Sequence, residues 1–345
     1  MSCAADRDIS GFLFDLTERI IHGDSVERDE AERIAELSEE HLLLLCHSAN
    51  RLRRHFRGDA VTCCSIVNAK SGSCPENCAF CAQSAHFTTD APVYPLLDTG
   101  TIIQAAVQAA RDGATGFGVV ISGPGIADED ELRAIGDALE AIVRRTGLEA
   151  HGSLGSLDEE QLRYLKLRGL VCFNHNLETA ESFFEQVVST HTYQDRVETV
   201  RAVKRVGIRV CCGGILGMGE SPAQRIELAM ALRELDVDVV PLNFLHPIPG
   251  TPLEHLSPLP PLQILSMIAL FRFILPGKEI KIAGGREKNL RDLQSMIFFA
   301  GADGIILGNY LTTFGRPAEA DLTLLRDLGL SIRPAGYTHS HSKEY

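Results

Sequence analysis

The chain has 345 residues, a length that fits two domains of ordinary size or a single α/β barrel. With 45% hydrophobic and 23% charged residues it is too apolar for a disordered protein, and its formal net charge of −13 makes nucleic acid and anionic membranes poor partners. No apolar run approaches the roughly 20 residues that cross a bilayer, and residues 1–8 lack a secretory signal pattern, so we expect a cytoplasmic protein.

The first predicted element is a helical extension at the N-terminus, residues 1–57, because apolar side chains recur at a period near 3.6 over residues 28–57. From residue 58 onward short apolar segments alternate with amphipathic stretches. The eight expected strands are 61–67, 116–122, 148–153, 170–174, 208–215, 237–243, 280–283 and 304–307. The expected helices are 101–112, 128–145, 158–168, 193–206, 221–235, 259–275 and 288–300, while 175–192 is mostly loop-like.

This alternation predicts parallel strands joined by helical crossovers. Eight such units over residues 58–330 favour a closed (β/α)8 TIM-type barrel, with an open doubly wound sheet as the alternative, and residues 331–345 are expected to form a flexible tail. A barrel carries its active site at the C-terminal ends of its strands. The polar and sulfur-bearing residues expected there are Ser122, His151, Asn174, His175, Asn176, Cys211, Cys212, Asn243 and Lys281.

Cysteines provide the strongest chemical signal. The chain has ten, and in a reducing compartment clustered cysteines point to metal or redox chemistry and not to disulfides. After the first expected strand the sequence reads KSGSCPENCAFCAQS, which spaces Cys74, Cys78 and Cys81 as C-x3-C-x2-C. Three thiolates can each bind one iron of a cubane and leave the fourth iron open. The alternative is a structural zinc site with a distant fourth ligand.

This spacing, with Phe80 before the third cysteine, resembles the radical S-adenosylmethionine (SAM) superfamily. Further stretches resemble biotin synthases, and they occur in that family's order from about residue 60 to residue 330. They are CSIVNAKSGSCPENCAFCAQS, NHNLET, HTYQDR, CGGILGMGE, HPIPGTPLE and GGRE.

The resemblance implies an enzyme in which Cys74, Cys78 and Cys81 hold a catalytic [4Fe–4S] cluster that cleaves bound SAM. The resulting radical would abstract hydrogen from dethiobiotin, and an auxiliary iron–sulfur cluster would donate the inserted sulfur. The resemblance also implies a homodimer and an electron donor such as flavodoxin or ferredoxin.

Six residues match positions that contact SAM or substrate in that family: Phe80, Asn174, Asn176, Glu178, Arg196 and Asn243. Amide side chains suit a ureido ring because each offers a donor and an acceptor. Glu178 is expected to accept from a ribose hydroxyl, and Arg196 matches an arginine near the auxiliary cluster.

The chain departs from better-known biotin synthases at that auxiliary cluster. Of the three cysteines and one arginine that hold a [2Fe–2S] cluster there, only Cys211 remains, while Gly118, His151 and Lys281 occupy the other positions. Lysine replaces the planar fork of arginine with a point charge.

New cysteines lead to the hypothesis of a different auxiliary cluster, [2Fe–2S] or larger. We expect Cys64, Cys211 and Cys212 to hold it, with His151 or Lys281 (or Cys63 or Cys172) completing the set. Neighbours in a regular strand face opposite ways, so joint binding by Cys211 and Cys212 requires a break or bulge. The alternative is that these cysteines are core residues.

Two other functions compete with biotin synthesis. One is another radical SAM enzyme of the same subgroup, a mutase or a metallocofactor maturase. The other is a zinc or iron–sulfur protein without turnover. Asn174, Asn176 and Asn243 favour biotin synthesis, because they are the expected substrate residues.

Overall fold

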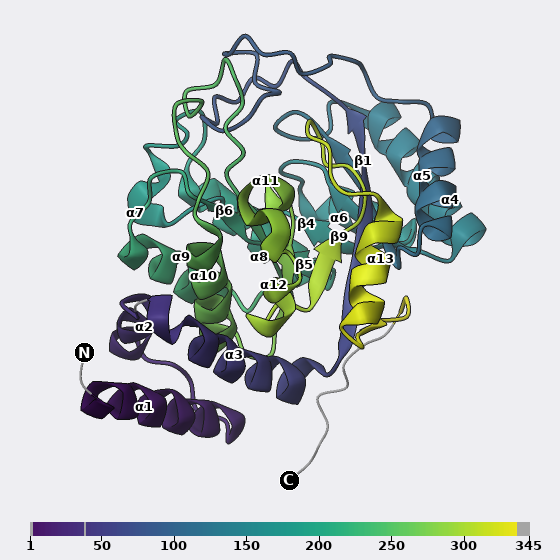
Figure 1. Ribbon diagram of the computed structural model, residues 1–345. Coiled ribbons are helices and arrows are strands. Elements are labelled where there is room, and N and C mark those ends of the chain that lie inside the picture. Colours follow the sequence, from purple (N-terminus) through teal and green to yellow (C-terminus); the bar gives the residue numbers. More distant parts are fainter. Residues whose placement is uncertain (1–2, 38, 337–345) are drawn as a thin grey trace.

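The computed structural model describes residues 3–37 and 39–336, and its N-terminal part is helical throughout. Its elements are α1 (Cys3–Ile21), α2 (Arg28–Ala35), the 3-10 turn η1 (Glu39–His41) and α3 (Leu42–Arg57). Helix α1 begins well before the helical pattern recognised from residue 28. The three helices lie across one end of the barrel, where α3 packs against α1 and α10 (Pro261–Ile274) (Figure 1).

The rest of the chain forms the predicted (β/α)8 barrel. Its strands are β1 (Ala60–Lys70), β2 (Gly116–Ile121), β3 (Glu149–Ser153), β4 (Leu170–Asn174), β5 (Arg209–Cys211), β6 (Gly214–Leu216), β7 (Val239–Phe244), β8 (Glu279–Ile282) and β9 (Gly304–Ile306). Neighbouring strands pair in parallel in chain order, with β5 and β6 sharing one position, and β9 pairs with β1. That last pairing closes the barrel and excludes the open sheet.

Helices surround the barrel (Figure 1). They are α4 (Thr99–Arg111), α5 (Glu129–Thr146), α6 (Glu159–Leu167), α7 (Glu181–Phe184), α8 (Tyr193–Val206), α9 (Pro222–Glu234), α10, α11 (Arg286–Leu290), the turn η2 (Arg291–Leu293), α12 (Met296–Phe299) and α13 (Ala318–Asp327). Side chains that cap the first turn, such as Asp98, Asp158 and Ser221, fix several of the starts. The single helix expected over 288–300 is broken because Arg291 has a positive φ of 51°.

The fifth expected strand, 208–215, is divided into β5 and β6 by Cys212 and Gly213. Glycine is required at this break because the chain passes close to its neighbours. A Cβ on Gly213 would collide with the carbonyl oxygen of Pro241, and one on Gly214 with that of Glu178. The break lies at the active-site end of the barrel.

Ordered structure continues beyond the expected boundary at residue 330. Strand β10 (Ser331–Ile332) pairs with the start of β1, and the buried Arg333 donates to the backbone oxygens of Arg57 and Ala60. The expected flexible tail therefore does not begin at residue 331, and its remainder, 337–345, lies outside the described residues. In the described part of the chain, no helix is both long and apolar enough to cross a membrane.

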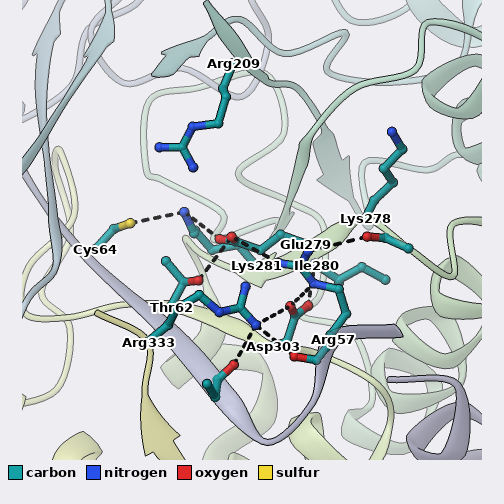
Figure 2. Close-up of polar contacts among 12 residues, drawn as sticks. Arg57, Thr62, Cys64, Arg209, Lys278, Glu279, Ile280, Lys281, Asp303 and Arg333 are labelled. Carbon is teal, nitrogen blue, oxygen red and sulfur yellow. Dashed lines mark hydrogen bonds and ion pairs between the residues drawn. The ribbon is translucent and has the colours of Figure 1, made fainter. Parts of the chain in front are cut away.

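A buried ion network closes the end of the barrel that faces the N-terminal helices (Figure 2). Asp303, which has no solvent exposure, accepts from Arg57 Nε at 2.6 Å, Arg272 Nη2 at 2.6 Å and the Ile280 amide at 2.8 Å. Because α3, α10 and β8 each supply a donor, one carboxylate joins the extension, the helical layer and the barrel.

Replacing Asp303 with alanine should lower the free energy of unfolding by about 3–5 kcal/mol, because it leaves the buried Arg272 without its carboxylate and Arg57 with only the more distant Glu279, at 3.6 Å. Urea titration followed by circular dichroism measures this. The matched control is Asp137→Ala, at a side chain 57% exposed whose partner Arg168 also pairs with Glu140, and it should change the midpoint little. Equal midpoints for the two variants would contradict the role of Asp303.

Candidate active site

A cavity of about 780 Å³ opens at the C-terminal end of the barrel, within the size range of small-molecule sites. The loop that follows β1 lines one side with Cys74, Cys78 and Cys81, and the interior of the barrel lines the other with Cys64 and Cys211. The cavity therefore joins two separate groups of cysteines.

The three-cysteine loop is held in shape by its own backbone. The Cys74 amide donates to the Gln83 carbonyl, the Ala85 amide to the Cys74 carbonyl at 2.7 Å and the Cys81 amide to the Cys78 carbonyl at 2.9 Å. Burial raises the pKa of the Cys78 thiol to about 12 and that of Cys81 to about 11. In the absence of metal these two thiols are protonated at neutral pH, so a bound cluster would take the place of their protons.

Side chains also fasten this loop to the segment before α8. Glu76 accepts from the Thr190 hydroxyl and lies 2.6 Å from His191 Nδ1. Asn77 donates to Ser189 Oγ at 2.8 Å and accepts from the Ser189 amide at 3.0 Å. The sequence analysis missed this contact, because the partners are more than 100 residues apart.

The same chain of hydrogen bonds continues to the residues expected at SAM. Arg196 donates to His191 Nε2 and to the Asn176 carbonyl, both at 3.0 Å, and its Nη1 lies 3.7 Å from Glu178 Oε1. Arg196 therefore lies on the side of the three-cysteine loop, where its charge acts on Cys78. Its expected place near an auxiliary cluster stays a prediction.

Glu178 stands in a strained position at the cavity wall. Its φ is +69°, and its backbone is fixed by hydrogen bonds with Gly213 and Ile215. Such strain in a non-glycine residue is typical of functional sites. Burial raises the pKa of the Glu178 carboxyl, and the Asn176 amide is its side-chain hydrogen-bond partner at 3.5 Å.

The remaining expected contact residues also line the cavity. Asn174 donates to Ser153 Oγ at 3.3 Å, and Asn243 bridges two turns by donating to the Gly214 carbonyl and accepting from the Gly284 amide. Phe80 packs against the small apolar cluster around Phe183. The role of Asn243 in the present structure is to hold these turns together.

His175 offers an unused polar atom. The side chain lines the cavity, is buried, and its Nε2 has no hydrogen-bond partner. Burial lowers its pKa to about 3, so the ring is neutral. An unpaired buried nitrogen is costly, and a bound ligand would supply the missing partner.

A second group of side chains converges inside the barrel, centred on Cys64 of β1, and Figure 2 shows the contact between Cys64 and Lys281. Lys281 Nζ of β8 lies 3.1 Å from Cys64 Sγ, and His151 Nδ1 of β3 lies 4.0 Å from it. Cys172 of β4 and Cys211 of β5 pack against each other in the same cavity. The sequence predicts Cys64 and Cys211 as ligands, and it offers His151, Lys281 and Cys172 as residues that could complete the set.

In this group the positive charges of Lys281 and His151 lie beside ionisable thiols, and each kind of group shifts the pKa of the other. Burial opposes ionisation of Cys64, but Lys281 and His151 more than offset it and lower the pKa of the thiol. Burial likewise opposes a charged His151, but the nearby cysteines and Glu149 raise its pKa to about 10. The two cations suit the anionic sulfur atoms of an iron–sulfur cluster, and the thiols can ligate its iron atoms as thiolates.

Cys212 does not join this group. Its side chain is fully buried in the hydrophobic layer outside the barrel wall, as is that of Cys63, and neither lines the cavity. The break after Cys211 does not turn both neighbours inward. The expectation that Cys212 is a ligand therefore needs revision in favour of Cys172, which lies two residues before Asn174 on the inner face of β4.

The five side chains of this inner group line a cavity and do not converge on one atom-sized position. Among the described residues, no three His, Cys, Asp or Glu side chains meet closely enough to hold a single metal ion. A multi-iron cluster, in contrast, distributes its protein ligands over two or more iron atoms. The arrangement fits a cluster better than one ion.

Comparison with known proteins shows two family models along the chain. The radical SAM superfamily model matches residues 70–243, and the biotin and thiamin synthesis associated domain matches residues 241–331. The curated biotin synthase of Geobacter sulfurreducens is 54% identical over 318 residues, 92% of this chain and 97% of that protein. The chain belongs to the biotin synthase family. The biotin synthase of Carboxydothermus hydrogenoformans is 45% identical over 92% of this chain and 98% of that protein.

As a member of this family, the chain is a radical SAM enzyme that uses SAM and a [4Fe–4S] cluster. It also carries an auxiliary iron–sulfur cluster, whose number of iron atoms the comparisons do not specify. Among solved structures, methylornithine synthase has a TM-score of 0.79 at 19% identity, covering 92% of this chain and 97% of its own. Such low identity shows the shared fold alone. The high identity to biotin synthases therefore favours that family over the mutase or maturase alternative.

Proposed function

We propose that this chain converts dethiobiotin to biotin by radical sulfur insertion. The observation that carries the proposal is the single cavity with a three-cysteine loop on one side and a second cysteine group on the other. When bound, the [4Fe–4S] cluster and SAM supply a radical that removes hydrogen from carbon, and the auxiliary cluster supplies sulfur. The substrate would lie between the two groups.

Cys74, Cys78 and Cys81 would hold the [4Fe–4S] cluster, and the protein around them would position SAM and substrate and exclude water. Six residues are proposed for that contact: Phe80, Asn174, Asn176, Glu178, Arg196 and Asn243. Five of the six also form hydrogen bonds or ion pairs with one another or with neighbouring backbone and side-chain groups, which orders the cavity wall before ligands bind. Preorganisation of this kind reduces the entropy lost on binding.

Cys64, Cys172 and Cys211 would hold the auxiliary cluster, with His151 and Lys281 completing its surroundings. Support comes from their convergence from five strands and from two glycines, Gly116 and Gly304, that leave space beside them. Cys212 is omitted from this ligand set because it lies in the outer hydrophobic layer.

We propose further, on the family resemblance alone, that the enzyme is a cytoplasmic homodimer reduced by a flavodoxin or ferredoxin. The three divisions expected from the sequence are likewise proposals: an extension over 1–57, a barrel over 58–330 and a C-terminal segment from 331. The half-exposed position of Cys74 supports electron entry from the loop side of the barrel.

The function is tested by incubating anaerobically reconstituted protein with dethiobiotin, SAM and a low-potential reductant. We expect biotin and 5′-deoxyadenosine to accumulate together, measured by mass spectrometry. 5′-Deoxyadenosine without biotin would contradict the proposed substrate or sulfur donor while leaving the SAM site intact. The absence of both products from protein that carries its iron would contradict the whole proposal.

Two single variants test the auxiliary ligands. Cys172→Ala should lower the iron content and abolish biotin formation while SAM cleavage continues. Cys212→Ala is the matched control, because it removes an equally buried thiol from the other side of the strands and should keep the full iron content. If the Cys212 variant lost the auxiliary iron and the Cys172 variant kept it, Cys212 and not Cys172 would be the ligand.

A further inference from the structure

A second polar layer lies directly beneath the proposed auxiliary site. Cys64, His151, Cys211 and Lys281 come from alternate positions around the barrel: β1, β3, β5 and β8. Residues two apart on a strand share a face, and alternate strands of a barrel fill one layer together. The layer below therefore consists of the residues two positions earlier on the same strands: Thr62, Glu149, Arg209 and Glu279.

Each glutamate of the lower layer contacts the cation two residues ahead of it. Glu149 Oε2 lies 3.2 Å from His151 Nε2, and Glu279 Oε1 lies 3.1 Å from Lys281 Nζ. Both cations point toward Cys64. The sequences Glu-Ala-His on β3 and Glu-Ile-Lys on β8 thus form the same arrangement, a glutamate paired with the cationic side chain two residues later.

Glu149 is itself fixed from two further directions. Arg209 donates to its Oε2, and the Gly336 amide donates to its Oε1 at 2.9 Å. The carboxylate thus connects β3, β5 and the C-terminal segment. With Nε2 held from below, the imidazole can turn little, and its Nδ1 remains on the side of Cys64.

Two glycines on the intervening strands make room for the cations. A Cβ on Gly116 would lie 2.5 Å from His151 Cε1 and 3.2 Å from Cys64 Sγ. A Cβ on Gly304 would lie 3.2 Å from Lys281 Cβ and 3.1 Å from Glu279 Oε1. These close approaches show that the wall is shaped around the two side chains.

We propose that Glu149 is a positioning residue that holds His151 by Nε2, so that Nδ1, after giving up its proton as iron binds, ligates an iron atom of the auxiliary cluster beside Cys64, Cys172 and Cys211. A carboxylate on the far nitrogen of a histidine ligand is a common way to orient the ring. This inference rests on the proposed function, because it requires an auxiliary cluster in the cavity.

The test uses the full chain with Cys74, Cys78 and Cys81 all replaced by alanine, so that only the auxiliary cluster contributes to the spectra. Pulsed electron paramagnetic resonance of the reduced protein should show coupling to a histidine nitrogen. Adding Glu149→Ala should abolish or strongly alter this coupling. Adding Glu149→Gln should preserve it, because an amide oxygen still accepts from the Nε2 hydrogen.

The matched control is Glu140→Ala, an exposed glutamate on α5, which should leave the coupling unchanged. Circular dichroism verifies that each variant is folded. The inference is overturned if the parent shows no histidine coupling, or if the coupling is unaltered in folded Glu149→Ala protein. Should Glu149→Ala not fold, loss of the coupling in Glu149→Gln would overturn it as well.

Failure of the inference is distinguishable from failure of the proposed function. If the chain without mutations makes biotin but lacks the histidine coupling, only the ligand role of His151 and its support by Glu149 are wrong. If that chain holds iron for a single cluster and makes no biotin, the proposed function fails first.

Discussion

Inside a closed barrel each inward side chain is stacked between the residues two positions before and after it on its strand. A polar group placed there has little access to water, so most of its partners come from the same or the adjacent layer. The interior of this protein follows that constraint. Thr62 Oγ1 donates to Glu279 Oε2 at 3.1 Å, Glu279 contacts Lys281, and Lys281 reaches Cys64. The position of Lys281 beside Cys64 in the cavity thus depends on polar partners in the layer below it.

The two ends of the barrel differ in structure: one holds a buried ion network and the other holds the cavity. At the N-terminal end, α3 lies across the barrel, β10 pairs with the start of β1, and Asp303 holds Arg57 and Arg272 in a buried network. At the C-terminal end polar residues such as Asn174 and Asn243 line the cavity, and side chains from the segment before α8 hold the three-cysteine loop in place. Stability is concentrated at one end, and open space for ligands at the other.

Much of this architecture follows from sequence patterns, because a buried strand and an amphipathic helix each leave a periodic signal. The barrel and the three-cysteine loop were both accessible in this way. Strand alternation also predicted that only one of Cys211 and Cys212 enters a regular barrel, but it could not choose between them. The choice depends on register, which is set by closure of the whole barrel. Similarly, the break at Arg291 depends on a backbone angle that no local pattern reveals.

The central claim is that one cavity holds two iron–sulfur clusters, the second among Cys64, Cys172 and Cys211. The most direct measurement is an anaerobic crystal structure of the reconstituted protein with anomalous diffraction at the iron edge. We expect two separate groups of iron peaks, one at Cys74, Cys78 and Cys81 and the other inside the barrel beside Cys64 and His151. A single group of peaks at the three-cysteine loop, in protein that makes biotin, would contradict it.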